Sequence, residues 1–482
     1  MAIKELHKQL SAKEKGAVEL TKRYLDRIEK YDKGINSYIT VSAEKAIKDA
    51  ELAQNRIFSG DSGLLTGIPL SIKDNICTLG TRTTCASKML EDFVPVYNAT
   101  VVEKLKNSGA VMLGKTNMDE FAMGGSSQTS YFGGVKNPYD LTRVAGGSSG
   151  GAAASVAAAL CVAALGSDTG GSVRQPAAFC GVTGLKPTYG AVSRYGLIAF
   201  ASSLDQIGVC GMTAEDCAII LAVICGEDKN DATSSDKAKG NYTELIGMSL
   251  KGKKIGIPKE FFGEGVSDEV KTAVMNGAEV YKDAGCELIE VSMPSLKYAV
   301  SAYYLISSAE AASNLSRFDG IKYGHRANGE TYDDIIKKTR SEGFGDEVKR
   351  RIMLGNYALS SGYYDAYYNN ANRIRTKIIE EYASIFEKCD VILTPTAPTG
   401  AYKIGQQEKD PVRMYLSDIC TVTVNIAGLP AISTPCGYDK DGMPIGMSIV
   451  GKAFDEANII AFCDVYEKTF CRKMPKERNS VQ

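Results

Sequence analysis

The sequence predicts an α/β protein with a large mixed central β-sheet that is covered by helices on both faces. Two observations lead to this fold class. Strand-like and helix-like segments alternate along the whole chain, and glycines cluster where such segments meet. Apolar residues make up 44% of the 482 residues and charged residues 23%, which is typical of a globular chain with an extensive core.

Composition also excludes several classes of function. The net charge of −1 gives no global indication of binding to nucleic acid or to a membrane. The longest apolar run, residues 152–165, is mostly alanine and is shorter than the roughly 20 residues of a membrane-spanning helix. The 13 cysteines are scattered and form no C-x-x-C pair, so we expect reduced thiols in a cytoplasmic protein.

The first part of the chain begins with helices. Residues 1–56 are expected to be helical, with Ser11 and Glu14 forming a capping box. Residues 65–76, "LTGIPLSIKDNI", predict a strand that enters a loop, and residues 100–117 predict a helix, a glycine stop and a strand.

The next elements include two further helices. The alanine-rich run 152–165 predicts a helix that leads into "ALGSDTGGS". A second capping box at Thr213 predicts a helix that ends at Gly226, and residues 226–246 predict a polar surface loop. The remaining expected elements are strands at 253–258, 286–294 and 390–398, a helix at 270–284, a mostly helical stretch at 296–388, and a hairpin at 431–451 that turns at Asp441-Gly442.

The segment "GAVMLGKT", residues 109–116, matches the phosphate-loop pattern G-x-x-x-x-G-K-[ST] letter for letter. A working phosphate loop follows a strand and opens a helix, but here a predicted helix precedes Gly109. The interior of the segment is itself strand-like. We therefore expect a buried strand that ends at Lys115 rather than a nucleotide site.

The segment "GGSSGG", residues 146–151, fits the nucleophile-elbow pattern G-x-S-x-G around either Ser148 or Ser149. A serine nucleophile usually needs a histidine base, and the chain has only His7 and His325. His7 lies in the first predicted helix, and His325 lies in a charged turn. A histidine-based triad is therefore not expected.

A neutral lysine is the alternative base for a serine nucleophile. Its pKa would have to fall by about three units from about 10.4, which burial can achieve. Lys73 follows five uncharged residues at the end of a predicted buried strand, although this stretch by itself is more typical of an exposed strand end. In "GSDTGGSVRQ", residues 166–175, two glycines before Ser172 would let successive backbone N–H groups face one point, as in an oxyanion hole. A tight surface turn is an equally good interpretation of that segment.

Taken together, Lys73 in "GIPLSIKDN", Ser148 in "GGSSGG" and Ser172 in "GSDTGGSVRQPA" resemble the amidase signature family in order and spacing. The similarity continues through "FCGVTGLKPTYGAVSRYG" (179–196) and runs nearly the full chain. It departs from the usual pattern at Ala145, where proline is common, and at Ala152, where a third serine is frequent.

The resemblance implies a Ser-cisSer-Lys triad. In such a triad Ser172 is the nucleophile, Ser148 transfers its proton after a cis peptide bond, and neutral Lys73 accepts it. The resemblance places the oxyanion hole at the N–H groups of Thr169, Gly170, Gly171 and the nucleophile. Asp168 and Arg174 are expected to brace this loop by hydrogen bonds.

Within the family, the chain resembles the glutaminase subunits of tRNA-dependent amidotransferases, notably in "GKTNMDEFAMGGSS" (114–127) and "SDICTVTVNIAGLPAISTPCG" (417–437). This implies glutamine recognition by Arg351, with Arg350 as the alternative, and by Asp418, with Tyr303 lining the pocket. It implies one amidase domain over residues 1–482, made of an N-terminal helical region (1–60), a catalytic core (61–225), a polar loop (226–250) and a second half (251–482).

The same resemblance implies partners. Ammonia from glutamine would convert Glu-tRNA(Gln), or Asp-tRNA(Asn), in a B subunit that binds ATP and Mg²⁺, with a small C subunit completing the complex. The tRNA would be contacted mainly through those partners. This chain itself would hold no metal and no cofactor. Two alternatives stay open: a stand-alone amidase acting on other carboxamides, and a non-catalytic scaffold or ATP-binding subunit built on "GAVMLGKT".

Overall fold

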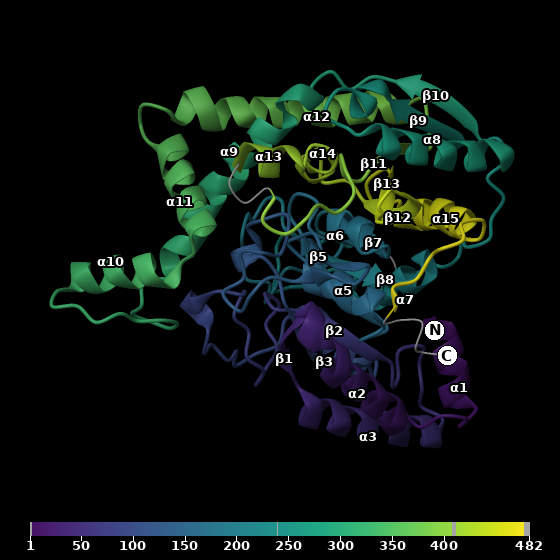
Figure 1. Ribbon diagram of the computed structural model, residues 1–482, viewed down its shortest axis with the longest axis horizontal. Coiled ribbons are helices and arrows are strands. Elements are labelled where there is room, and N and C mark those ends of the chain that lie inside the picture. Colours follow the sequence, from purple (N-terminus) through teal and green to yellow (C-terminus); the bar gives the residue numbers. More distant parts are fainter. Residues whose placement is uncertain (1, 239, 407–410, 477–482) are drawn as a thin grey trace.

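The computed structural model describes residues 2–238, 240–406 and 411–476. In these residues one sheet of 11 strands crosses the whole molecule (Figure 1). In spatial order its strands are β1 (Tyr38–Val41), β3 (Val111–Thr116), β2 (Pro69–Lys73), β6 (Ala163–Asp168), β8 (Gln206–Gly211), β7 (Thr183–Lys186), β12 (Ala431–Tyr438), β13 (Pro444–Val450), β11 (Val391–Pro395), β9 (Lys254–Pro258) and β10 (Glu287–Val291). A separate pair is formed by β4 (Lys136–Asn137) and β5 (Asp140–Val144).

The sheet is mixed, and its parallel part positions the site. Strand β2 runs parallel to both β3 and β6. Lys73 ends β2 and Asp168 ends β6, so these two residues lie at the same edge of the sheet. The carboxyl ends of parallel strands are where α/β proteins usually place their ligands.

Helices cover both faces of the sheet. A Cβ at Gly446 in β13 would lie 2.4 Å from Ala178 of α6 (Arg174–Phe179). The next residue along the strand, Met447, contacts Gly277 of α8 (Asp268–Asp283). Successive strand residues point to opposite faces, so α6 and α8 lie on opposite sides. The predicted fold class, an α/β fold with a mixed sheet covered on both faces, is confirmed.

The N-terminal region differs from the expectation in two places. Strand β1 interrupts the predicted helices, which are α1 (Ile3–Ser11), α2 (Ala17–Ile35) and α3 (Ala43–Ser59). The Ser11 capping box is wrong, because Ser11 is the last residue of α1 and the next helix is capped at Gly16. The buried stripe of Ile3, Leu6 and Leu10 extends helix α1 through Ser11.

The alanine-rich run is also divided differently. Helix α5 (Gly150–Ala157) ends early, and the run continues as strand β6. Arg27 of α2 donates hydrogen bonds of 2.9 Å to the carbonyl oxygens of Ala158 and Ala159, just beyond the end of α5. Because all of these alanines are buried, their pattern carried no periodicity that could place this boundary.

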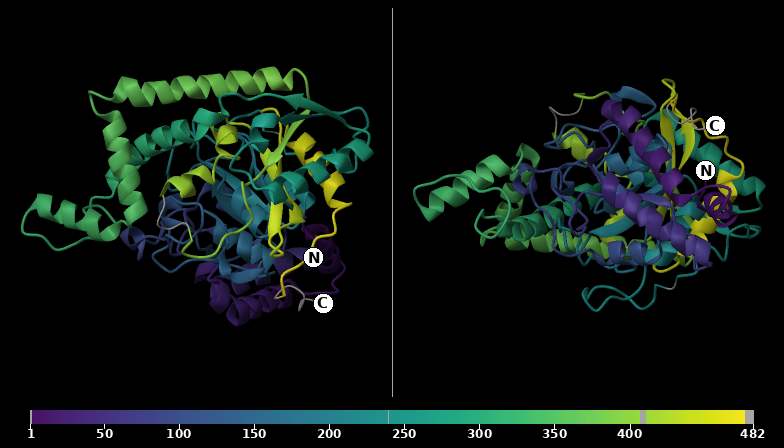
Figure 2. Two further views of the ribbon diagram at one scale, coloured as in Figure 1. Left: turned by 45° about the horizontal axis from the view of Figure 1, so that its top comes forward. Right: turned by 90° about the horizontal axis from the view of Figure 1, so that it is seen from below.

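The second half follows the sequence more closely. The hairpin β12–β13 turns at Asp441-Gly442, and residues 226–246 contain no helix or strand among those described. The other helices are α4 (Thr100–Asn107), α7 (Ala214–Ile224), α9 (Leu296–Asn314), α10 (Tyr332–Gly343), α11 (Asp346–Leu359), α12 (Asn370–Phe386), α13 (Pro411–Leu416), α14 (Val422–Ile426) and α15 (Glu456–Glu467). Helices α10 and α11 project from the body as an arm (Figure 2).

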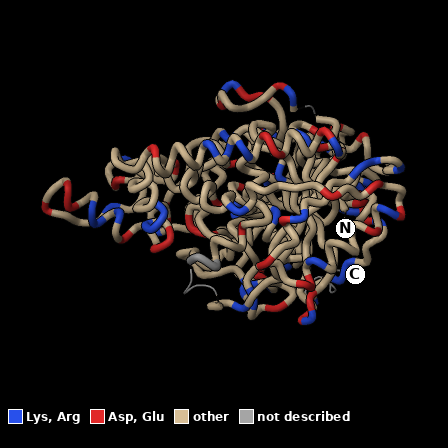
Figure 3. The backbone as a smooth tube through the Cα atoms, turned by 90° about the horizontal axis from the view of Figure 1, so that it is seen from above, with Lys and Arg blue, Asp and Glu red and all other residues tan. Residues whose placement is uncertain are grey.

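Surface and side-chain chemistry agree with the composition. Basic and acidic residues are interspersed along the arm and over the body on the face seen in Figure 3. All 13 cysteines are free, and 12 of them are buried. No helix in the described part of the chain has the length and apolar character that spanning a membrane would require.

Candidate active site

The three residues expected to carry the chemistry come from different connections at one edge of the sheet. Lys73 ends β2, Ser148 precedes α5, and Ser172 lies between β6 and α6. The Lys73 Nζ lies 2.8 Å from the Ser148 Oγ, and the Ser149 N–H donates to the Ser172 carbonyl oxygen at 3.0 Å. Lys73 and Ser148 are fully buried while Ser172 is 7% exposed, so Ser172 is the member that a substrate can reach.

The hydrogen bonds around Lys73 distinguish the two adjacent serines. Its Nζ also lies 2.8 Å from the Ser149 Oγ and 2.9 Å from the Ser167 Oγ. The Ser149 hydroxyl donates its own proton to the Ser167 carbonyl oxygen at 3.1 Å. A neutral amine has two N–H groups and one lone pair, so it can donate to Ser149 and Ser167 and accept from Ser148. This arrangement favours Ser148 as the residue that passes a proton to Lys73.

The environment of Lys73 favours its neutral form. Burial lowers the pKa of Lys73 to about 7, and the nearby carboxyl groups of Asp119, Asp168 and Asp205 oppose part of that shift. A large fraction of the side chain is therefore uncharged near neutral pH. A lysine in this state can accept a proton from a hydroxyl group.

The turn that carries Ser148 depends on a close approach of the backbone to Asp119. The Gly147–Ser148 peptide bond is cis, as the family resemblance implied. A Cβ at Gly147 would lie 2.0 Å from the Asp119 Oδ2 and 2.7 Å from the Ser126 nitrogen. The same Asp119 carboxylate accepts the Ser127 N–H at 2.8 Å. Only glycine fits at position 147 unless this neighbouring loop moves.

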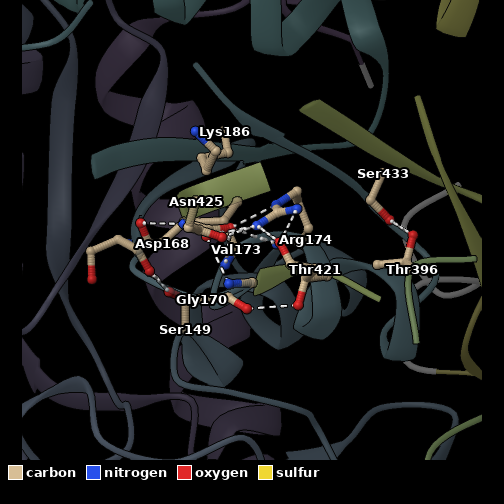
Figure 4. A network of polar contacts seen from close by, with 12 residues as sticks. Ser149, Asp168, Gly170, Val173, Arg174, Lys186, Thr396, Thr421, Asn425 and Ser433 are labelled. Atoms are coloured by element: carbon tan, nitrogen blue, oxygen red, sulfur yellow. Dashed lines mark hydrogen bonds and ion pairs between the residues drawn. The ribbon is translucent and has the colours of Figure 1, made fainter. Parts of the chain in front are cut away.

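The nucleophile loop is held by a buried ion pair, as the sequence predicted (Figure 4). Arg174 donates to the two carboxylate oxygens of Asp168 at 3.0 and 3.1 Å. The same carboxylate accepts the N–H of Gly171 at 2.8 Å and the side-chain amide of Asn425 at 2.8 Å. Burial alone would raise the pKa of Asp168, but Arg174 and these hydrogen bonds hold it well below its usual range.

The expected oxyanion hole, Thr169, Gly170 and Gly171, lies on this loop. The Gly171 N–H is occupied by Asp168, and the Gly170 carbonyl oxygen accepts the Thr421 hydroxyl at 2.6 Å. Both polar atoms of the Gly170–Gly171 peptide group are therefore used within the protein. An oxyanion hole here would draw on the amides of Thr169, Gly170 and Ser172, and Gly171 could join only by giving up its present bond.

Arg351 lies in α11 and has an unused donor. Its side chain is 2% exposed, and its Nε donates to the Glu347 Oε1 at 2.6 Å. The guanidinium lies 4.3 Å from the ring centre of Tyr304 and 4.9 Å from that of Tyr415. Within the described residues its Nη1 has no hydrogen-bond partner. A buried arginine with a free N–H can take a ligand carboxylate.

Asp418 lies close to this arginine. The Tyr304 hydroxyl donates to the Asp418 Oδ2 at 2.7 Å. Burial raises the pKa of Asp418 to about 7, while the bond from Tyr304 and the charge of Arg351 oppose the rise. Tyr303 packs on the nucleophile loop instead, because a Cβ at Gly170 would lie 2.5 Å from the Tyr303 hydroxyl oxygen. One pair of neighbouring tyrosines thus contacts both halves of the site.

The neighbouring arginine has a different environment. The Arg350 side chain is 46% exposed and forms an ion pair with the Glu347 Oε2. It lines a cavity of about 310 Å³ together with Ser126 and Thr129, which belong to the loop that contacts Gly147. Burial and proximity to Asp418 favour Arg351 over Arg350 as the carboxylate-binding residue.

The other two sequence motifs have structural roles. Residues 111–116 of "GAVMLGKT" form the buried strand β3, and the Lys115 Nζ donates to the Ile76 carbonyl at 2.6 Å and to the Thr83 hydroxyl at 2.7 Å. His7 lies in α1, and the His325 Nε2 lies 3.4 Å from Glu342 on the arm. The contacts of Lys73 are made with serines, and neither histidine is among them.

This geometry agrees with comparisons against known proteins. A family model described as Amidase matches residues 19–460. The chain belongs to the amidase family. Within it, the chain is 57% identical to the A subunit of the glutamyl-tRNA(Gln) amidotransferase of Ruminiclostridium cellulolyticum, over 98% of each chain. It is 55% identical to the corresponding protein of Caldanaerobacter subterraneus, over 98% of this chain and 96% of that one.

Solved structures of amidase-family members have the same fold. The A subunit of the glutamyl-tRNA(Gln) amidotransferase of Thermotoga maritima superimposes with a TM-score of 0.80 at 41% identity, covering 95% of this chain and 94% of that chain. The peptide amidase of Stenotrophomonas maltophilia superimposes with a TM-score of 0.83 at 28% identity, covering 98% of each chain. The fold is therefore shared by family members that act on different amides.

Sequence reasoning missed three residues of this amidase-family site. Glu347, Tyr304 and Tyr415 surround Arg351, and none of them was singled out. The only available signal was spacing, because Glu347 and Arg351 are four residues apart on one helix face. The two tyrosines come from other elements, and no local pattern connects them to Arg351.

Proposed function

We propose that this chain is the glutaminase subunit of a tRNA-dependent amidotransferase. Its product, ammonia, would convert Glu-tRNA(Gln) to Gln-tRNA(Gln), and Asp-tRNA(Asn) to Asn-tRNA(Asn) where that substrate is used. The observation that carries the proposal is the pairing of Arg351 with Asp418 beside the Ser172 loop. One buried cation and one carboxylate match the α-carboxylate and α-ammonium groups of free glutamine.

In the proposed reaction the Ser172 Oγ attacks the side-chain amide carbon of glutamine. The Ser172 proton passes to the Ser148 oxygen while the Ser148 proton passes to the Lys73 Nζ, which lies 2.8 Å away. Backbone N–H groups of residues 169–172 stabilise the oxyanion. The proton then returns to the leaving nitrogen, ammonia departs, and water hydrolyses the γ-glutamyl ester by the same path in reverse.

The partners follow from the names of the relatives. We propose B and C subunits, with ATP and Mg²⁺ bound in the B subunit and the tRNA contacted mainly through these partners. The use of Lys115 within the buried strand β3 supports ATP chemistry in another chain. We also propose that the chain acts as a single amidase domain in the cytoplasm, which the continuous sheet of 11 strands supports.

The alternatives make different demands on the site. A stand-alone amidase acting on an apolar amide would leave Arg351 and Asp418 without charged partners, which costs binding energy. A scaffold or ATP-binding subunit would not need a lysine whose pKa is about 7 next to a buried serine. Failure of a fluorophosphonate probe to label Ser172, together with ATP binding by the isolated chain, would favour that third interpretation.

The test uses the purified complex with and without Ser172→Ala. We expect the variant to lose glutamine hydrolysis and glutamine-dependent amidation of tRNA. Amidation with an ammonium salt should persist at the wild-type rate, because the partner active site is untouched. Glutamine-dependent amidation by the variant would contradict the mechanism. Glutaminase activity without any tRNA product would instead favour the stand-alone amidase.

A further inference from the structure

Thr421 joins the two halves of the site. It lies just before α14 (Val422–Ile426), three residues after Asp418, and is 1% exposed. Its N–H donates to the Asp418 carbonyl oxygen at 3.0 Å. Its hydroxyl lies 2.6 Å from the Gly170 carbonyl oxygen and 3.1 Å from that of Asp418. The single hydroxyl proton serves the closer acceptor, Gly170.

This contact determines the orientation of one peptide group in the nucleophile loop. The peptide group between Gly170 and Gly171 is planar, so fixing its carbonyl and its N–H fixes its rotation. Thr421 binds the carbonyl oxygen, and Asp168 binds the N–H at 2.8 Å. The adjacent peptide groups, which carry the N–H of Gly170 and of Ser172, are oriented by the same constraint.

The approach between Thr421 and the loop is very close. Gly171 has a φ of +129°, and a Cβ there would lie 2.3 Å from the Thr421 Oγ1. Arg174 contacts Thr421 from another side, since both of its terminal nitrogens lie 3.3 Å from the Thr421 carbonyl oxygen. Figure 4 shows Thr421 between Gly170 and Arg174. The ion pair of Arg174 therefore supports Thr421 as well as the loop.

We propose that Thr421 is a positioning residue for catalysis by Ser172. Its hydroxyl holds the Gly170–Gly171 peptide group so that Ser172 and the neighbouring N–H groups face the scissile carbonyl. Because the same residue is bonded to Asp418, it also sets the distance between the glutamine-binding turn and the nucleophile. The second statement rests on the proposed glutaminase function, whereas the first requires only a reactive Ser172.

The test compares Thr421→Val, which keeps the shape and removes the hydroxyl, with Thr421→Ser, which keeps the hydroxyl. Both are made in the purified complex and normalised by titration of active sites. For Val we expect kcat for glutamine to fall about 10- to 100-fold with KM changed less than about threefold. The Ser variant should retain kcat within about threefold. The midpoint of the pH–kcat profile should stay at the wild-type value in both variants, because the environment of Lys73 is unchanged.

A second readout does not depend on glutamine. The rate at which a fluorophosphonate labels Ser172 should fall by a similar factor in Thr421→Val and recover in Thr421→Ser. If wild type labels Ser172 but does not hydrolyse glutamine, the glutaminase proposal fails while this arm still decides the role of Thr421. Wild-type labelling and kcat in Thr421→Val would overturn the proposal, and so would a change in KM alone.

Protein folding is monitored by thermal melting of each variant. If Thr421→Val does not fold, Thr421→Ala takes its place in the comparison with Thr421→Ser. Equal labelling rates in the Ala and Ser variants would then overturn the proposal. A lower rate in Ala alone would support it, because the two side chains differ only by the hydroxyl group.

Discussion

The Lys73 Nζ lies 2.8 Å from the Ser148 Oγ inside the protein, and the neighbouring Ser149 has already committed its proton to the Ser167 carbonyl. The two adjacent serines of "GGSSGG" therefore differ in what they can do for Lys73. Ser148 can give it a proton, and Ser149 can only receive a hydrogen bond from it.

This difference predicts unequal effects of two matched substitutions. Ser148→Ala removes the proton path and should lower kcat at least about 1,000-fold, comparable with the loss of a triad member. Ser149→Ala removes one hydrogen bond to Lys73 and should cost about 10-fold or less. Steady-state hydrolysis of glutamine measures both variants. A larger loss in Ser149→Ala than in Ser148→Ala would reverse the assignment.

The pH dependence follows from two groups. The pKa of Lys73 is lowered to about 7 and that of Asp418 is raised to about 7, both by burial. Lys73 must be neutral to accept a proton, and Asp418 must be ionised to bind an ammonium group, so both must be deprotonated. Activity should therefore fall as the pH drops below 7, and log(kcat/KM) should approach a slope of two.

The matched control for this profile is Asp418→Asn, which retains the hydrogen bond from Tyr304 but cannot titrate. Its kcat/KM should be lower at every pH, and its acidic limb should have a slope of one. A slope of two in this variant would show that another group, and not Asp418, contributes the second proton.

The two neighbouring arginines should differ in their effect on glutamine binding. Arg351→Lys keeps the charge but loses the two-pronged geometry of the guanidinium, so KM should rise about 10- to 100-fold, as expected for loss of about 1.5–3 kcal/mol. Arg350→Lys changes a half-exposed side chain and should leave KM within about threefold. Glutamine titrations of both variants decide between them, and the reverse result would move the carboxylate site to Arg350.

Gly147→Ala should damage the site through its neighbours. The added Cβ would lie 2.0 Å from the Asp119 carboxylate, so the Ser148 turn or the Asp119 loop must move. We expect kcat to fall at least about 100-fold and stability to fall by about 1–3 kcal/mol. Gly362→Ala is the control, because no atom lies within 4 Å of a Cβ there. Wild-type labelling of Ser172 in Gly147→Ala would show that the turn tolerates the change.

The fold class and most strands could be predicted from the amino-acid sequence, because alternating patterns and turn residues are local signals. The same is true of "GAVMLGKT" as a strand, since the order of helix and strand around Gly109 excludes a phosphate loop. The family resemblance brought Lys73, Ser148 and Ser172 together as a set. Local patterns did not reveal the end of α5, because buried alanines look the same in a helix and in a strand.

How the site works depends on contacts that only the folded chain makes. Which serine can give a proton to Lys73 depends on the Ser167 carbonyl oxygen, which belongs to another strand. The pKa of Lys73 depends on burial, which no single segment determines. Glu347, Tyr304 and Thr421 act through contacts with residues that are near only in space, except for the helical pair of Glu347 and Arg351. Hydrogen bonds and desolvation depend on three-dimensional neighbours, and a linear pattern records only those that are close in sequence.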